Sequence, residues 1–207
     1  MSFLQALDLA AVFVFGLTGA LAASRAQLDI VGFIFLACLT AVGGGTVRDV
    51  VMGRETVFWV AEPLMIVSAT LAAFLVFFTA HLLESRLRAL EWLDAVALGV
   101  AVPAGVGLAL SMGAPWIVVA IMGVATGTFG GLMRDVVCNE VPLILKKGEL
   151  YATAALAGAL VALGAVALGL PNGAALVACG AATFCLRAGS MLFGWNLPVY
   201  RSRPPRS

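Results

Sequence analysis

The chain contains a long internal repeat. The segment 40–51, TAVGGGTVRDVV, recurs as the segment 126–137, TGTFGGLMRDVV, at a constant offset of 86 residues and without a gap. The same offset relates Asp8 to Asp94 and Gly19 to Gly105. Each copy places glycines and an Arg-Asp pair inside an apolar segment, where such residues are costly. A duplicated cost of this kind points to a site between two related halves of the molecule.

Composition places the chain in a membrane. Of its 207 residues, 62% are hydrophobic and 11% are charged, against about 25% charged in a soluble domain. We therefore predict an all-α integral membrane protein with seven transmembrane helices, since each span takes about 20 apolar residues. The net charge of +1 gives no reason to expect nucleic acid as a partner. The predicted spans are residues 4–23, 28–52, 64–83, 92–112, 115–139, 150–170 and 173–194.

Basic residues predict the orientation of these spans. With the N-terminus outside, nine basic residues fall at cytoplasmic positions, and only Arg48 and Arg54 fall on the outer side. We therefore predict a multi-pass protein of a bacterial inner membrane, with its N-terminus outside and its C-terminus in the cytoplasm. The cytoplasmic set is Arg25, Arg86, Arg88, Arg134, Lys146, Lys147, Arg201, Arg203 and Arg206.

The repeat and the orientation together predict an inverted architecture. Each copy holds three spans, an odd number, so the second copy enters the membrane from the opposite face. The predicted units are two inverted three-helix repeats, residues 1–83 and 84–170, and a seventh transmembrane helix over residues 171–195. Residues 196–207 are predicted to form a cytoplasmic tail.

Glycines interrupt the second and fifth spans, at residues 43–45 and 130–131. Each glycine inside a helix costs about 1 kcal/mol relative to alanine. We therefore predict that the second and fifth helices are kinked or locally unwound there. Carbonyls freed by an unwound turn need partners, which in a bilayer are protein, water or ions. Close helix packing is the alternative use of such glycines.

An Arg-Asp pair follows each glycine segment. Adjacent residues on a helix point about 100° apart, so we expect Arg48 and Arg134 to pair away from their neighbours Asp49 and Asp135. Salt bridges that hold the architecture are one interpretation of these charges. A water-filled path lined by them is another, and the two are compatible.

Two further carboxylates, Asp8 and Asp94, lie near the starts of the first and fourth spans. A negative charge near a helix N-terminus is stabilised by the helix dipole. We therefore expect both residues to cap their helices.

These motifs resemble those of a known family. The pattern Gly-Gly-Gly-Thr-x-Arg-Asp at 43–49, its partner Gly-Gly-x-x-Arg-Asp at 130–135, and the three-plus-three-plus-one arrangement of spans are similar to prokaryotic members of the trimeric intracellular cation channel family. The resemblance covers the chain up to about residue 195. It implies a homotrimer with a pore in each subunit, placed between the repeats beside the second and fifth helices. It also implies passive permeation by monovalent cations, principally potassium.

The motifs also indicate which residues line the ion path. Carbonyl, hydroxyl and carboxylate oxygens suit a partly dehydrated cation, whereas Arg48 and Arg134 oppose cation entry and are assigned to structure or gating. The two halves do not offer identical ligands, because Phe129 and Leu132 stand where the first copy has glycine and threonine. The residues expected at the helix breaks and along the ion path are Gly43, Gly44, Gly45, Thr46, Asp49, Thr126, Thr128, Gly130, Gly131 and Asp135.

A transporter of a small zwitterion such as glycine is the alternative function. Arginine can meet a carboxylate and aspartate an ammonium group, and bacterial relatives of the family have also been labelled glycine transporters. An enzyme is not expected, since the chain has one histidine and no evident nucleophile–base pair or metal-ligand cluster. We expect no cofactor and no metal beyond transient potassium. The expected partners are potassium ions, further copies of the chain and membrane lipids.

Overall fold

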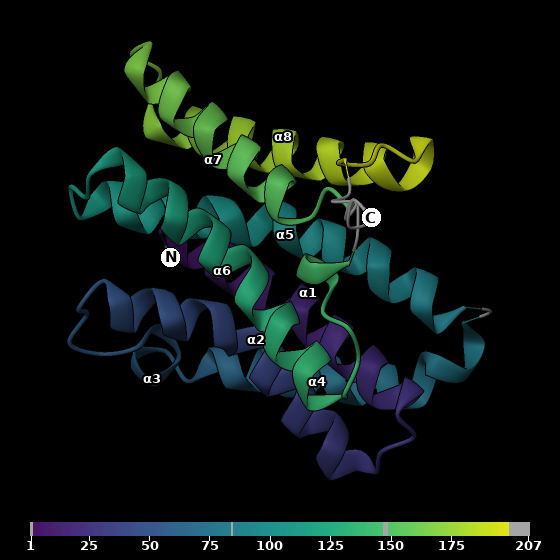
Figure 1. The fold of residues 1–207 in the computed structure, drawn as a ribbon. Helices are drawn as coiled ribbons and strands as arrows, with labels where there is room; N and C mark the ends of the chain where they lie inside the picture. The colour runs from purple at the N-terminus through teal and green to yellow at the C-terminus, as the bar shows by residue number, and fades with distance from the viewer. Residues whose placement is uncertain (1, 84, 147–148, 199–207) are drawn as a thin grey trace, which may run out of the picture.

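The fold is a bundle of helices joined by short loops (Figure 1). The computed structural model describes all residues except 1, 84, 147–148 and 199–207. The described residues form α-helices, short 3₁₀ helices and loops, so the prediction of an all-α protein is confirmed. The elements are α1 (Phe3–Arg25), α2 (Ile30–Val51), α3 (Phe58–Ala61), α4 (Leu64–Thr79), η1 (Ala80–Leu82), α5 (Arg86–Ser111), α6 (Trp116–Val137), η2 (Leu143–Leu145), α7 (Ala152–Ala167) and α8 (Asn172–Phe193).

Within the described residues, six helical segments are long and apolar enough to cross a bilayer. They coincide with six of the predicted spans, and η1 extends α4 to complete the third of them. The remaining predicted span, residues 150–170, is observed as α7, which has 16 residues. At about 1.5 Å per residue such a helix is shorter than a hydrocarbon core of about 30 Å. A seventh crossing therefore stays a prediction.

Serine residues begin two of the long helices. The hydroxyl of Ser2 accepts a hydrogen bond from the backbone N–H of Gln5, whose side chain accepts one from Ser2 in return. Ser85 caps α5 through its hydroxyl. Asp8 and Asp94 lie inside α1 and α5, so the expectation that they cap these helices is wrong. Both helices begin at serines that satisfy the first N–H groups, so Asp8 and Asp94 fall beyond the first turn.

The glycine segments of α2 and α6 do not unwind. Both helices are continuous through residues 43–45 and 130–131. The predicted unwound turn is therefore wrong, because the backbone carbonyls there keep their helical partners and need no ion or water. A kink without unwinding stays a prediction.

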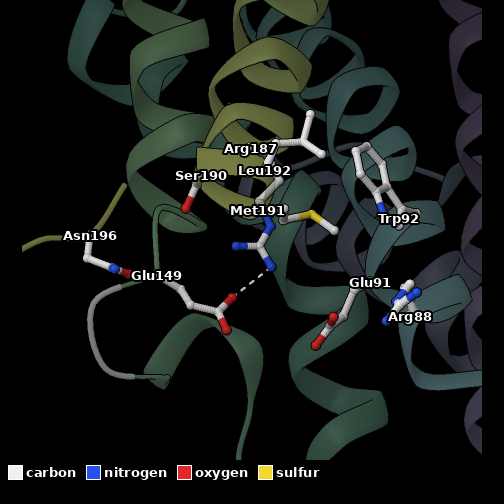
Figure 2. Close-up of a pocket in the computed structure, with 9 residues that line it drawn as sticks. All are labelled: Arg88, Glu91, Trp92, Glu149, Arg187, Ser190, Met191, Leu192 and Asn196. Atoms are coloured by element: carbon white, nitrogen blue, oxygen red, sulfur yellow. Dashed lines mark ion pairs between the residues drawn. The ribbon is translucent and has the colours of Figure 1, made fainter. Parts of the chain in front are cut away.

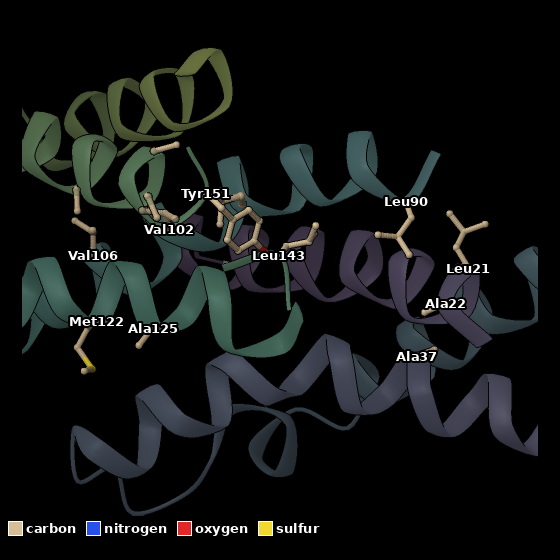
Figure 3. Close-up of a cluster of buried hydrophobic side chains, with 14 of the residues drawn as sticks. Leu21, Ala22, Ala37, Leu90, Val102, Val106, Met122, Ala125, Leu143 and Tyr151 are labelled. Carbon is tan, nitrogen blue, oxygen red and sulfur yellow. The ribbon is translucent and has the colours of Figure 1, made fainter. Parts of the chain in front are cut away.

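Helices α1 and α5 occupy the centre of the bundle. α1 packs against α2, α4 and α5, while α5 packs against α6, α7 and α8, and α2 packs against α6. Figure 3 shows part of the resulting core, in which Leu21, Val102 and Val106 are almost fully buried. Many of the remaining core positions are alanines, which let helix backbones approach closely. Helices α1, α2, α5 and α6 therefore meet in one place.

The predicted division into residues 1–83, 84–170, 171–195 and 196–207 stays a prediction, as does the orientation in the membrane. Several residues used for these predictions lie outside the described part of the chain. They are residue 84, at the predicted boundary between the repeats, and Lys147, Arg201, Arg203 and Arg206, which were assigned to the cytoplasmic side.

Candidate functional site

Helices α2 and α6 touch at two glycines that the repeat offset relates. A Cβ atom on Gly44 would collide with the carbonyl oxygen of Thr126, and one on Gly130 would collide with the carbonyl oxygen of Thr40. Thr40 meets the later residue of α6, Gly130, whereas Gly44 meets the earlier one, Thr126. The two helices therefore run antiparallel. Close packing, the alternative use of these glycines, describes both positions.

A buried charge cluster lies beyond this contact, near the end of α2. Arg48 is fully buried and donates from Nη1 to Asp8 of α1 and from Nε to Asp49, each at 2.8 Å. The second oxygen of Asp49 accepts hydrogen bonds from the backbone N–H of Phe58 at 2.7 Å and from Arg54 at 3.1 Å. The Asp8 side chain keeps 19% of its surface exposed. This cluster, named the outer cluster after the side of the membrane predicted for it, joins α1, α2 and the start of α3.

A second cluster repeats this pattern near the end of α6. Arg134 donates from Nη1 to Asp94 of α5 and from Nε to Asp135, each at 2.8 Å. The second oxygen of Asp135 accepts a hydrogen bond from the backbone N–H of Leu143 at 2.9 Å. In the described part of the chain, one Asp94 oxygen and the Tyr151 hydroxyl have no hydrogen-bond partner. Because α2 and α6 are antiparallel, this second cluster, named the inner cluster after its predicted side, lies at the opposite end of their contact.

The two clusters correct part of the predicted pairing. Each arginine bonds to a distant aspartate, as expected, but it also bonds to the neighbouring aspartate, so the expectation that it points away from that neighbour is wrong. The arginine side chain is long enough to turn back to the next residue, and its planar guanidinium has further N–H groups for a second carboxylate. Removing one partner from a buried ion pair typically costs about 3–5 kcal/mol. These buried ion pairs are consistent with the interpretation that both arginines hold the architecture, which stays a prediction.

Two aromatic residues that the sequence did not single out lie against repeated glycines. A Cβ atom on Gly45 would meet the ring of Phe58 at 2.5 Å, and one on Gly131 would meet the hydroxyl of Tyr151 at 3.1 Å. The Arg48 guanidinium lies over the Phe58 ring, 5.4 Å from its centroid. The two aromatics lie at unequal distances beyond their motifs, so the repeat offset does not reveal them.

Three threonines of the predicted site use their hydroxyl protons within their own helix. Thr46, Thr126 and Thr128 each donate to the carbonyl four residues earlier. Thr46 also accepts a hydrogen bond from the indole of Trp59 at 3.0 Å, a contact that the sequence did not suggest. A hydroxyl that donates to its own helix offers only lone pairs to a ligand, which suits a cation.

A narrow cavity lies where α1, α2, α5 and α6 meet. Its volume is about 10 Å³, enough for roughly one water molecule. Asp8 and Phe58 line it from the outer cluster. Of the predicted ion-path residues, Gly44, Gly45 and Thr126 line it. The cavity therefore brings one carboxylate and one threonine side chain to the contact of the four helices.

The other predicted ion-path residues do not line this cavity. The oxygens of Asp49 and Asp135 are engaged by arginine and backbone N–H groups. A Cβ atom on Gly43 would lie 2.8 Å from the sulfur of Met133 in α6. A direct contact of these residues with an ion stays a prediction. The predicted ion-path residues outside the lining are Gly43, Thr46, Asp49, Thr128, Gly130, Gly131 and Asp135.

Similar sequences are found among bacterial membrane proteins. The family described as glycine transporter matches residues 5–81 and residues 91–167. The UPF0126 inner membrane protein YadS of Escherichia coli is 40% identical over 159 residues, which cover 75% of each chain. A UPF0126 membrane protein of Vibrio cholerae is 35% identical over 206 residues, which cover 96% of this chain and 83% of that one.

A solved structure shares the fold. The trimeric intracellular cation channel orthologue from Rhodobacter sphaeroides is 45% identical to this chain and superposes with a TM-score of 0.90. The match covers 94% of this chain and 100% of the other. The arrangement of helices around the cavity is therefore shared with a protein of known structure.

Proposed function

We propose that this chain, which belongs to the prokaryotic trimeric intracellular cation channel family, forms a passive channel for monovalent cations, principally potassium. The observation that supports this most directly is the cavity where α1, α2, α5 and α6 meet, which Asp8 and Thr126 line and which lies beside the glycine contact of α2 and α6. Each subunit of a homotrimer carries one such pore. The channel works in a bacterial inner membrane, with its N-terminus outside.

Asp8 and Thr126 are the side chains proposed to meet the ion first. Asp8 is partly exposed, and its second oxygen makes only a long contact of 3.5 Å with Arg48. The Thr126 oxygen keeps free lone pairs. Carboxylate and hydroxyl oxygens can replace part of the hydration shell of a cation. Arg48 and Arg134 hold the helix ends and take no part in ion binding.

The gate is proposed to be the contact between α2 and α6. A cavity of about 10 Å³ admits about one water molecule, so a hydrated ion passes only after it widens. At Gly44 and Gly130 the two helices meet without interlocking side chains. Such a surface lets one helix tilt or slide on the other with little loss of side-chain packing.

Current across a planar bilayer tests this function. With purified protein and unequal potassium chloride on the two sides, we expect discrete steps that reverse near the potassium equilibrium potential. Asp8→Asn is expected to lower the unitary conductance by up to about tenfold at low salt, because one charge in a narrow mouth concentrates cations. Screening reduces the effect at high salt.

Glu140→Gln is the matched control for Asp8→Asn, because Glu140 is an exposed carboxylate whose ion pair with Arg25 lies away from the cavity. We expect this variant to conduct like the unmodified protein. Currents that reverse near the chloride potential, or none from folded and inserted protein, would argue against a cation channel.

Glycine transport is the second candidate, because the family match carries that description. A zwitterion has a carboxylate for arginine and an ammonium group for aspartate. Against this, Arg48 and Arg134 are already bonded to two aspartates each. Uptake of labelled glycine into proteoliposomes distinguishes the two: saturation supports a transporter, whereas uptake that stays linear with concentration counts against it.

A further inference from the structure

A second and larger cavity lies near the start of α5 and the end of α8 (Figure 2). Its volume is about 510 Å³, within the usual range of about 300–1,000 Å³ for small-molecule sites. None of its lining residues belongs to α2 or α6, so it is separate from the proposed pore. Its polar lining includes Arg88, Glu91, Trp92, Glu149, Arg187 and Ser190.

The most unusual group in this cavity is the guanidinium of Arg187. Its side chain is only 2% exposed, and it forms an ion pair with Glu149 at 2.7 Å (Figure 2). The ring of Tyr151 covers one of its faces, 5.4 Å from the Cζ atom. Among the described residues, no group accepts a hydrogen bond from its Nε. A guanidinium has five N–H donors, and leaving buried donors unpaired is costly, so this group can bond to a further acceptor.

The remaining polar groups define what that acceptor can be. Arg88 adds a second guanidinium, whereas the two carboxylates each face a cation, Glu149 with Arg187 and Glu91 with Lys146 at 3.8 Å. Guanidinium groups bind phosphate oxygens through paired N–H bonds. The carboxylates disfavour a highly charged anion. The site therefore suits a phosphate group that carries one negative charge better than one that carries two.

The surroundings place this cavity near the surface of the membrane. Leu192, Phe193, Trp195 and Leu197, at and after the end of α8, are all exposed, and Phe193 stacks on Trp195. Exposed aromatic and aliphatic side chains at the end of a spanning helix are typical of the membrane–water interface. A phosphate bound here lies at the depth of lipid headgroups, with apolar side chains beside it for acyl chains.

We propose that this cavity binds a phosphate oxyanion through Arg187 and Arg88, supplied either by a lipid headgroup or by free phosphate. This site does not depend on the proposed channel function. Arg187 lies on the ring of Tyr151, and the Tyr151 hydroxyl lies 3.1 Å from the position of a Cβ atom on Gly131. A ligand on Arg187 is therefore connected to α6 and the inner charge cluster by one side chain, that of Tyr151.

Ligand titrations on delipidated protein in detergent test the site. The probes are dioctanoyl phosphatidylglycerol, inorganic phosphate, and dioctanoylglycerol, which has the same acyl chains but no phosphate. The dissociation constant is obtained from the thermal unfolding midpoint as a function of ligand concentration. We expect phosphatidylglycerol to bind and dioctanoylglycerol not to. If inorganic phosphate binds and phosphatidylglycerol does not, free phosphate is the ligand.

Three variants separate the site from general effects of charge. Arg88→Gln is expected to raise the dissociation constant about tenfold, the loss of one charged hydrogen-bonding partner. Glu149→Gln is expected to lower it, because it releases the Arg187 guanidinium. Arg25→Gln, a change of the same kind at an arginine paired with Glu140 and outside the cavity, is the control.

Two results would overturn the site. One is equal binding of phosphatidylglycerol and dioctanoylglycerol, or no binding of either phosphate probe. The other is the same dissociation constant in Arg88→Gln, Glu149→Gln and Arg25→Gln. All three substitutions involve partly exposed side chains, so their folding can be checked by the unfolding midpoint without ligand.

Discussion

Arg48 and Arg134 are costly residues to bury, and the structure surrounds each with carboxylates. The outer cluster contains two arginines and two aspartates, because Arg54 reaches Asp49 from the loop after α2. The inner cluster has Arg134 with two aspartates, and no second arginine joins it among the described residues. The two ends of the α2–α6 contact therefore differ in charge, although the motifs that build them are repeats.

Replacing Arg134 is expected to destabilise the fold strongly. Arg134→Gln leaves two buried aspartates without a counter-charge, which should cost about 3–5 kcal/mol and lower the thermal unfolding midpoint in detergent. Arg54→Gln is the control, because this side chain is 33% exposed and its removal leaves Asp49 paired with Arg48 and the Phe58 N–H, so a smaller loss is expected. Similar midpoints for the two variants would show that the inner cluster is not held by charge pairing.

Contacts between helices explain why glycine recurs at particular positions. Gly19 packs on the carbonyl of Leu36, and Gly105, at the repeat offset, packs on that of Met122. Gly44 and Gly130 do the same between α2 and α6. At each of these positions backbone meets backbone, so the helices are as close as they can be. A side chain added at one of these positions would meet backbone atoms, so it would have to displace a whole helix rather than another side chain.

Gly44→Ala tests this arrangement. The added methyl group collides with the carbonyl of Thr126, so we expect a destabilisation of about 1–3 kcal/mol, the usual cost of overpacking. Gly164→Ala in α7 is the control, since nothing lies within 4 Å of its Cβ position. It should be neutral or stabilising by up to about 1 kcal/mol through helix propensity. Both values come from unfolding in detergent, and a neutral Gly44→Ala would contradict the close contact.

At the scale of the whole molecule, the antiparallel contact of α2 and α6 separates the two charge clusters along the bundle. If the N-terminus lies outside, the Asp8–Arg48 cluster faces the exterior and the Asp94–Arg134 cluster faces the cytoplasm. The phosphate site proposed at the end of α8 then lies on the cytoplasmic side. All three assignments rest on the excess of basic residues at one face.

Reporter fusions in Escherichia coli measure the orientation. Green fluorescent protein fused to the C-terminus is expected to fluoresce, because that end is predicted to lie in the cytoplasm. Alkaline phosphatase fused after Met112, in the loop between α5 and α6, is expected to be active, because that loop is predicted to lie outside. The reverse pattern would exchange the two faces and place the phosphate site outside.

Much of the fold could be predicted from the sequence, because the relevant signals are local or periodic. Apolar length and low charge predict membrane helices wherever the chain is placed, and six of the predicted spans coincide with long apolar helices. The offset of 86 residues also identified Asp8, Asp94 and the two arginines as a related set before any contact was known. The bilayer requires each spanning segment to be long, apolar and helical by itself, so these features can be predicted without knowing how the segments pack.

Only the tertiary structure decided what these residues touch. Asp8 lies 40 positions from Arg48, and Tyr151 lies 36 positions from Arg187. Whether such residues meet depends on how each helix is rotated and where it crosses its neighbours, which no local pattern encodes. For that reason the aspartates expected to cap helices are ion-pair partners, and glycines expected at a kink or an unwound turn form helix contacts. The cavity around Arg187 and Glu149 had no sequence signal, because α5, the loop before α7 and α8 meet there only after folding.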